Sequence, residues 1–198
     1  MRLHRLGDRA TVAGMMRSGL VMLLLACAPA LAQTPPSDKH AAVERMLDAL
    51  KTAPDEQMAA LLEGHVEELW TTSGTPAVTL LMGRGLRELK AGANQDAIED
   101  FGDAVALQPD LAEAWRRRAE ARFAAGDAAG AVVDLGEAVK REPREFLAYR
   151  TLARIAAARG DWKAAYEAWQ KVLLIDPKTP GGDQRLKELR RKAFGEEA

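Results

Sequence analysis

The histidines, serines and cysteine of this chain are too few and too scattered to build a catalytic site. Beyond the first 32 residues the histidines are His40 and His65, and the serines are Ser37 and Ser73. The one cysteine, Cys27, precedes them, so a cysteine zinc site and an intrachain disulfide are both excluded. No nucleophile, base and orienting group recur together, and no glycine-rich phosphate loop follows a strand. We therefore expect no enzymatic activity, no cofactor and no bound metal.

Arginine is the residue type whose spacing best fits recognition chemistry. Arg116 and Arg150 stand 34 residues apart, and Arg154 follows Arg150 by four. Two arginines four residues apart on a helix repel each other unless an anion lies between them. Guanidinium groups suit carboxylates because their donors form a planar fork. The pattern predicts a surface for an acidic partner segment. The alternative is a solvated face whose arginines pair with Glu113, Glu120 or Glu145. The run Arg116–Arg118 is interpreted as a solvated face, because successive residues point in different directions around a helix.

Composition narrows the class of partner. The chain has 198 residues and a formal net charge of −1, so no single-sign field favours nucleic acid. Hydrophobic residues make up 47% of the chain and aromatic residues only 5%, so a core of small side chains with a few large rings is expected. We therefore expect a protein or peptide partner and no nucleic acid.

Residues 1–32 have the pattern of a secretory signal. A positive end is followed by a short apolar run, residues 19–26, and then by the sequence Ala-Leu-Ala at 30–32. Small residues at the two positions that a signal peptidase reads predict cleavage before Gln33. The apolar run is too short to span a bilayer, so no transmembrane span is expected. The positive residues are Arg2, Arg5, Arg9 and Arg17.

A second interpretation of the leader is a lipoprotein signal. The sequence Leu-Leu-Ala before Cys27 resembles a lipobox, which would make Cys27 the lipidated first residue. Met15 or Met16 is an alternative start to Met1. Both interpretations export the protein, and we expect a periplasmic location with cleavage before Gln33 as the favoured route.

A 34-residue period organises the chain from residue 78 to residue 179. Prolines, glycines and alanines each recur at that step, and such a period is typical of helix–turn–helix units that stack on copies of themselves. The units are 78–111, 112–145 and 146–179. The recurring residues are Pro109, Pro143 and Pro177, Gly92, Gly126 and Gly160, and Ala97, Ala131 and Ala165.

Each unit resembles the tetratricopeptide repeat. The fourth residue of a unit is large, the eighth is small, and the twenty-fourth is bulky. Small residues let the two helices of a unit cross closely, and the large ones fill the remaining space. Gly126-Asp127 and Gly160-Asp161 are expected to end one helix and cap the next. Two departures weaken the match, because the seventh residue is arginine in units one and two, and the eleventh is Glu88 and then Arg122. The matching residues are Leu81, Trp115 and Tyr149, Gly85, Ala119 and Ala153, and Phe101, Leu135 and Trp169.

The flanking segments predict two caps. Residues 33–37 are expected to be a flexible mature end. Residues 38–74 show two apolar stripes at helical spacing, which predicts a helical hairpin that covers the open face of unit one, with Trp70 sealing it there. A degenerate repeat is the alternative for this segment. Residues 180–198, with a helix over 183–194, are expected to cap the last unit. The predicted fold is thus all-α, a short right-handed α-solenoid of three units with a hairpin before and a helix after.

The resemblance also implies where a partner would bind. In proteins with this repeat the first helix of each unit lines a concave groove, and the implied groove is apolar at unit one and basic toward unit three. The candidate groove residues are Met82, Leu86, Leu89, Lys90, Arg116, Glu120, Phe123, Leu147, Arg150 and Arg154.

The resemblance, to an exported bacterial type of tetratricopeptide-repeat protein, implies a scaffold or adaptor that holds a partner segment in this groove. One alternative is a chaperone-like assembly factor for an envelope apo-protein, as in cytochrome maturation. Another is an accessory subunit that stiffens an envelope complex through its convex face.

Overall fold

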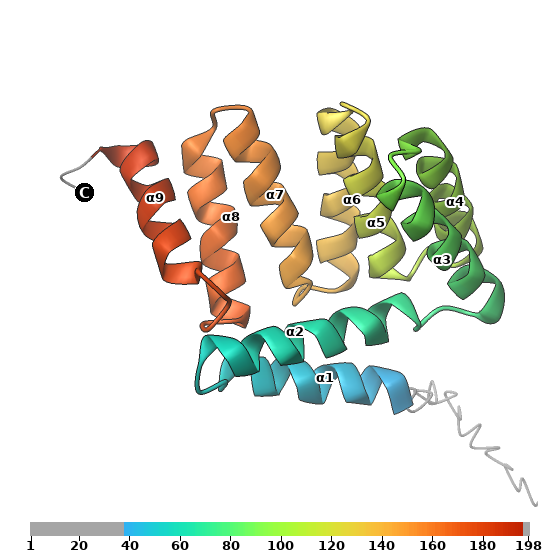
Figure 1. Cartoon of the computed structure of the whole chain (residues 1–198), viewed down its shortest axis with the longest axis horizontal. Coiled ribbons are helices and arrows are strands. Elements are labelled where there is room, and N and C mark those ends of the chain that lie inside the picture. The colour runs from blue at the N-terminus through green and yellow to red at the C-terminus, as the bar shows by residue number, and fades with distance from the viewer. Residues whose placement is uncertain (1–37, 196–198) are drawn as a thin grey trace, which may run out of the picture. The chain divides into compact units, whose positions relative to one another are not determined.

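The computed structural model describes residues 38–195, and every regular element in that range is a helix (Figure 1). The all-α class predicted from the sequence is confirmed. The leader, its cleavage site and residues 33–37 lie outside the described range. The helices are α1 (Asp38–Lys51), α2 (Glu56–Thr71), α3 (Pro76–Lys90), α4 (Asn94–Leu107), α5 (Ala112–Ala124), α6 (Ala128–Arg141), α7 (Phe146–Ala158), α8 (Trp162–Ile175) and α9 (Gly182–Phe194).

Helices α3 to α8 form three antiparallel pairs stacked in chain order, and α9 packs on α8 (Figure 1). Each pair is closed by a large buried residue at the same place in the period. These residues are Phe101, Leu135 and Trp169. In the first pair Gly85 lies directly beneath Phe101, where an added Cβ would be 2.8 Å from the ring. The small-against-large packing expected from the sequence is therefore present.

The turns inside the second and third pairs follow from two residues each. Gly126 and Gly160 end α5 and α7 with φ of 91° and 76°, a backbone region that only glycine enters freely. Asp127 and Asp161 then cap α6 and α8, because their carboxylates accept hydrogen bonds from the backbone N–H of Gly130 at 2.8 Å and Ala164 at 3.1 Å.

The arginines that depart from the repeat pattern pair with buried aspartates of the second helix. Arg84 of α3 forms an ion pair with Asp100 of α4. Arg118 of α5 donates two hydrogen bonds to Asp134 of α6, at 2.7 and 2.8 Å, and Arg122 lies 2.8 Å from the same carboxylate. Both aspartates are buried. Ion pairs across the helix pair thus replace apolar contacts in the first two units.

The third unit has neither member of this pair. Leu152 stands where the other units have arginine, Ala168 stands where they have aspartate, and both line one apolar pocket. The two positions change together, arginine with aspartate and leucine with alanine.

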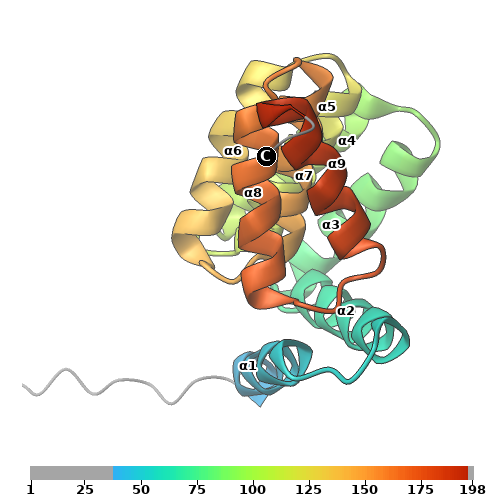
Figure 2. The same cartoon turned by 90° about the vertical axis from the view of Figure 1, so that its left-hand side faces the viewer.

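The N-terminal hairpin does not lie where the sequence predicted. Helices α1 and α2 run crosswise past the ends of the repeat helices (Figures 1 and 2), and α2 contacts α3 and α5 while α1 contacts α8. Trp70 packs against Phe146 of the third unit, with ring centroids 5.7 Å apart, instead of sealing unit one. The physical reason is that Phe146, Leu147 and Ile175 supply the apolar patch that completes the hairpin's own core.

Among residues 38–195, no helix combines the length and the apolar character needed to span a bilayer.

Candidate functional site

The first helices of the three pairs, α3, α5 and α7, are neighbours and carry all the predicted groove residues. We call their shared surface the inner face. Its half nearest the N-terminal ends of these helices is covered by α2, and the other half is not. The two halves therefore have different chemistry and are described separately.

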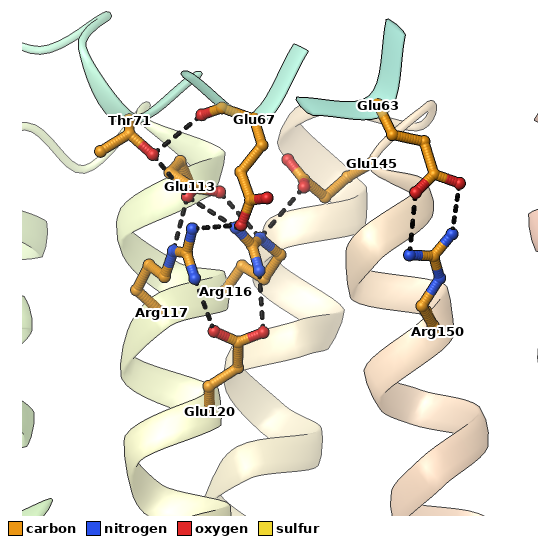
Figure 3. Close-up of polar contacts among 9 residues, drawn as sticks. All are labelled: Glu63, Glu67, Thr71, Glu113, Arg116, Arg117, Glu120, Glu145 and Arg150. Atoms are coloured by element: carbon orange, nitrogen blue, oxygen red, sulfur yellow. Dashed lines mark hydrogen bonds and ion pairs between the residues drawn. The ribbon is translucent and has the colours of Figure 1, made fainter. Parts of the chain in front are cut away.

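Arg116 is the centre of the covered half and is almost fully buried, with 1% of its side chain exposed. Its guanidinium donates to Glu113 at 2.6 and 2.7 Å and to Glu120 at 2.8 Å, and its Nε lies 3.2 Å from Glu145 (Figure 3). Glu145 is the residue just before α7, so the cluster joins α5 to the start of α7. Burial would lower the pKa of Arg116, but the carboxylates around it raise that pKa and keep the group charged.

The carboxylates of this cluster have unequal proton affinities. Burial raises the pKa of Glu145 well above its usual value, and Arg116 only partly offsets this effect. Burial also opposes ionisation of Glu120, but the charges of Arg116 and Arg117 outweigh it and hold the pKa of Glu120 below its usual value. Burial and ion pairing thus shift the pKa values of Glu145 and Glu120 in opposite directions within one cluster.

Helix α2 joins the cluster through Arg117. The guanidinium of Arg117 lies 2.6 Å from Glu67 of α2, 2.7 Å from Glu113 and 3.1 Å from Glu120 (Figure 3). The hydroxyl of Thr71, one turn beyond Glu67, donates to Glu113 at 3.3 Å. These contacts bind the acidic side of α2 to the N-terminal end of α5.

A second polar cluster holds α2 to the third unit. Arg150 of α7 donates to both carboxylate oxygens of Glu63 at 2.6 and 3.2 Å (Figure 3), and the hydroxyl of Thr179 donates to Glu63 at 2.7 Å. Burial, with the neighbouring Glu63 carboxylate, raises the pKa of Asp176 to about 7. Burial opposes ionisation of Glu63, but its hydrogen bond from Arg150 and further contacts lower its pKa. On acidification the pair therefore takes up its first proton on Asp176, while Glu63 keeps its charge.

Three predicted groove residues are buried or covered in this structure, Leu147 only in part. Met82 is fully buried in the core of the first pair, Arg116 is enclosed by carboxylates, and Leu147 packs against the hairpin. Arg150 is one-third exposed and engaged with Glu63. The expectation that Arg116 and its neighbours form a solvated face is wrong, because Arg116 is enclosed by internal carboxylates.

The remaining predicted residues lie on the uncovered half of the inner face. The described contacts of Arg154 include no carboxylate within ion-pair distance, and its guanidinium lies 5.4 Å from the ring centroid of Phe123. The residues there are the half-buried Leu86, Leu89, Glu120 and Phe123 and the exposed Lys90 and Arg154. We call this set the open half. That it binds a partner stays a prediction.

A small basic pocket borders the open half. It has a volume of about 220 Å³ and is lined by Arg150, Thr151, Arg154, Trp169 and Arg185 together with Ala153. Arg185 comes from α9, which the sequence suggested only as a cap. The sequence shows that residues 183–194 are basic, but this does not indicate which side of α9 packs against the repeats. Among residues 38–195, no group of acidic, histidine or cysteine side chains is arranged to hold a metal ion.

Comparison with known proteins agrees with this architecture. A family model described as tetratricopeptide repeat matches residues 122–193. A TPR repeat-containing protein of Rhizobium etli is 28% identical over 153 residues, which is 77% of this chain and 75% of that protein. These matches show that the chain is similar to tetratricopeptide-repeat proteins.

Two solved structures show the same fold. The crystal structure of MamA protein has a TM-score of 0.56 at 21% identity, covering 80% of this chain and 85% of that one. The first TPR of Spaghetti bound to the HSP90 peptide SRMEEVD has a TM-score of 0.55 at 21% identity, covering 58% of this chain and 91% of that one. Together with the helix pairs described above, they identify an all-α solenoid of the tetratricopeptide-repeat type.

Proposed function

We propose that this protein is an exported interaction scaffold that holds a segment of another protein against the open half. The observation that carries the proposal is Arg154. It is an exposed cation with no carboxylate within ion-pair distance among the described residues, and it lies beside the half-buried ring of Phe123. A cation next to apolar surface fits a segment that combines an acidic residue with an apolar one.

The comparisons add support for peptide binding. The structure of the first TPR of Spaghetti holds a peptide with acidic residues near its end, SRMEEVD. That chain shares the solenoid fold with this one, and the same inner helices are available here for an extended segment or a helix. Acidic character in the partner is inferred from the arginines of this chain, including the pocket formed by Arg154 and Arg185.

Titration calorimetry with a peptide panel tests the proposal. The panel pairs acidic peptides carrying one aromatic or leucine residue with copies in which Gln and Asn replace Glu and Asp. We expect the acidic member of a pair to bind at least tenfold more tightly. In the chain, R154E should weaken that binding at least tenfold, because it reverses the exposed cation that lies beside Phe123 in the open half.

A matched control is available on the same helix end. Arg159 is exposed and lies outside the open half, so R159E makes the same charge change without touching it. Binding by R159E should stay within about twofold of the wild type, since it lies on the rim of a different pocket. Equal affinities of R154E and the wild type for every acidic peptide would refute the proposal. Arg150 is a poorer probe, because Glu63 already engages it.

A second candidate function is an accessory subunit that stiffens an envelope complex. It is favoured by an apolar pocket of about 430 Å³ between α6, α7 and α8, lined in part by Val132, Leu152, Ile155 and Ala156. Affinity purification from envelope extract separates the candidates. A fixed stoichiometric complex favours the accessory subunit, and transient capture of unfolded clients favours a chaperone-like assembly factor.

Export itself is part of the proposal and has its own test. The positive end, the apolar run and the Ala-Leu-Ala sequence before Gln33 support a cleaved leader. The intact mass of the protein recovered from the periplasm should correspond to a chain that begins at Gln33. A mass that corresponds to a lipidated Cys27 would support the lipoprotein route instead.

A further inference from the structure

We propose that the covered half of the inner face is a second docking surface, and that α2 occupies it as an internal stand-in for an acidic amphipathic helix of a partner. The partner helix would present two carboxylates one turn apart, in place of Glu63 and Glu67. Arg117 and Arg150 carry this surface and are not among the residues of the open half, so the proposal does not depend on what binds there, although Arg150 also lines the basic pocket at the border.

The first step is the pattern on α2. Glu63, Glu67 and Thr71 follow one another at four-residue steps, so they form one stripe along the helix. All three point at the repeat helices: Glu63 at Arg150, Glu67 at Arg117 and Thr71 at Glu113 (Figure 3). The stripe thus contacts two neighbouring units through two guanidinium groups.

The second step is that the second unit does not need α2 to keep its buried charges paired. Arg116 is held by Glu113, Glu120 and Glu145, which all belong to α5 or to the segment before α7. Its contact with Glu67 is the longest of the set, at 3.7 Å. Arg117 likewise keeps Glu113 and Glu120 when Glu67 is taken away. Release of α2 therefore strands no buried charge in the second unit.

The third step is that the hairpin is built to move as one piece. Its helices share a core of their own, and only the short segment 72–75 joins it to α3. The repeat residues in its core are Phe146, Leu147 and Ile175. Its ion pairs from α1 go to one residue of the segment before α7, Arg144, which pairs with Glu44 and Asp48. Glu67 is 42% exposed and contributes little when it is ion-paired, because solvent screens it. The core residues are Val43, Leu47, Leu50, Ala53, Ala59 and Val66.

The fourth step is the chemistry of the vacated surface. Without Glu63 and Glu67, Arg117 and Arg150 would face solvent from neighbouring first helices. Guanidinium groups one unit apart are complementary to carboxylates one turn apart on a crossing helix, as α2 itself demonstrates. Phe146 and Leu147 lie beside them and supply the apolar contact that Trp70 now makes. A partner helix with the same spacing would find the complete set of contacts.

The test uses the chain from residue 33 to 198, which contains the whole compact unit. The probe is a fluorescent peptide with the sequence of α2, residues 56–71. In the wild type, α2 is tethered beside this surface at a high local concentration, so it competes with the probe for the same site. In E63K and in E67K a lysine replaces the internal carboxylate and repels Arg150 or Arg117, so the hairpin should open and the probe should bind at least tenfold more tightly.

Hydrogen exchange measures the opening directly. Deuterium uptake by residues 56–71 should become at least fivefold faster in E63K and E67K. The control is E68K, because Glu68 lies on the same helix, is exposed and forms no ion pair with the repeats among the described contacts. It should match the wild type in both assays. A probe in which Gln replaces both Glu63 and Glu67 should bind E63K and E67K no more tightly than it binds the wild type.

Two results would overturn the proposal. If E63K and E67K leave the deuterium uptake of residues 56–71 unchanged, the carboxylates do not hold α2 in place. Faster uptake without any probe binding would show that the vacated face is not a docking surface. If E63K loses its helical circular dichroism, E67K carries the test, since its carboxylate is partly exposed and outside the Asp176 cluster.

Discussion

Replacing Arg118 by leucine gives the sharpest test of how the second helix pair is held together. Asp134 is 1% exposed and accepts two hydrogen bonds from Arg118, with Arg122 as its other cation. Removing one partner of a buried ion pair costs about 3–5 kcal/mol when the remaining charge is left unpaired. Because Arg122 stays in place, we expect R118L to lower the free energy of unfolding by about 2–3 kcal/mol.

The double substitution R118L/D134A should recover most of that loss. It gives the second unit the leucine and alanine that the third unit has at Leu152 and Ala168. Replacing a buried ion pair by apolar residues of similar volume is often neutral, so the double variant should lie within about 1 kcal/mol of the wild type. D134A alone should cost about 1–2 kcal/mol, since both arginines are partly exposed and can turn toward water.

Urea unfolding followed by far-ultraviolet circular dichroism measures all four proteins. The coupling free energy of the cycle should be at least about 2 kcal/mol, with the same dependence on urea in each variant. Additive effects would refute the reasoning, because they would mean that Arg118 and Asp134 stabilise the pair independently. A double variant less stable than either single one would show that leucine and alanine cannot pack there.

Two further predictions concern protonation and packing. Asp176 has its pKa raised from 3.8 to about 7, so between these values the folded chain holds a proton that the unfolded chain has released, and stability should fall as the pH rises through that window. D176N should flatten this slope in urea midpoints measured across the window, and an unchanged slope would contradict the assignment. G85A should destabilise by about 1–3 kcal/mol, because its Cβ would meet Phe101 at 2.8 Å. G102A, at a helical glycine with open space around it, should stabilise by up to about 1 kcal/mol, and equal thermal unfolding of the two variants would contradict both expectations.

The repeat architecture could be predicted because it rests on short-range rules. Helix ends depend on a glycine and an aspartate next to each other, as at Gly126 and Asp127, and those residues act as expected. The small and large residues of a pair lie within one unit, as Gly85 and Phe101 do. Residues of the same kind recur every 34 positions, so the three units support the same interpretation, a stack of helix pairs.

The ion pairs inside the units had a signal that sequence reasoning overlooked. Arg118 and Asp134 are 16 residues apart, and so are Arg84 and Asp100. Arginine at the seventh place of a unit was considered alone, as a departure from an apolar pattern. Considered with the aspartate across the pair, it would have predicted the buried contacts.

The position of the hairpin could not be predicted from such rules. Glu63 and Arg150 are 87 residues apart, and Glu67 and Arg117 are 50 apart. A stripe of carboxylates on one helix and arginines on others fits a solvated surface, an external partner or an internal contact equally well. The sequence suggested Glu113, Glu120 and Glu145 as partners for these arginines, and Arg116 pairs with all three. It did not suggest that Arg150 pairs with Glu63 of the hairpin.

The crosswise hairpin also changes the mechanics of the solenoid. In a stack where each unit contacts only its neighbours, the first and last units can move apart or rotate relative to each other. Here α2 contacts α3 and α5, while α1, on the same hairpin, contacts α8, so the first and last units are tied through one brace. The resistance of the solenoid to bending and twisting then depends in part on this hairpin, which lies outside the repeats. A pulling force applied across units one and three would therefore strain the contacts of the hairpin as well as the junctions between units.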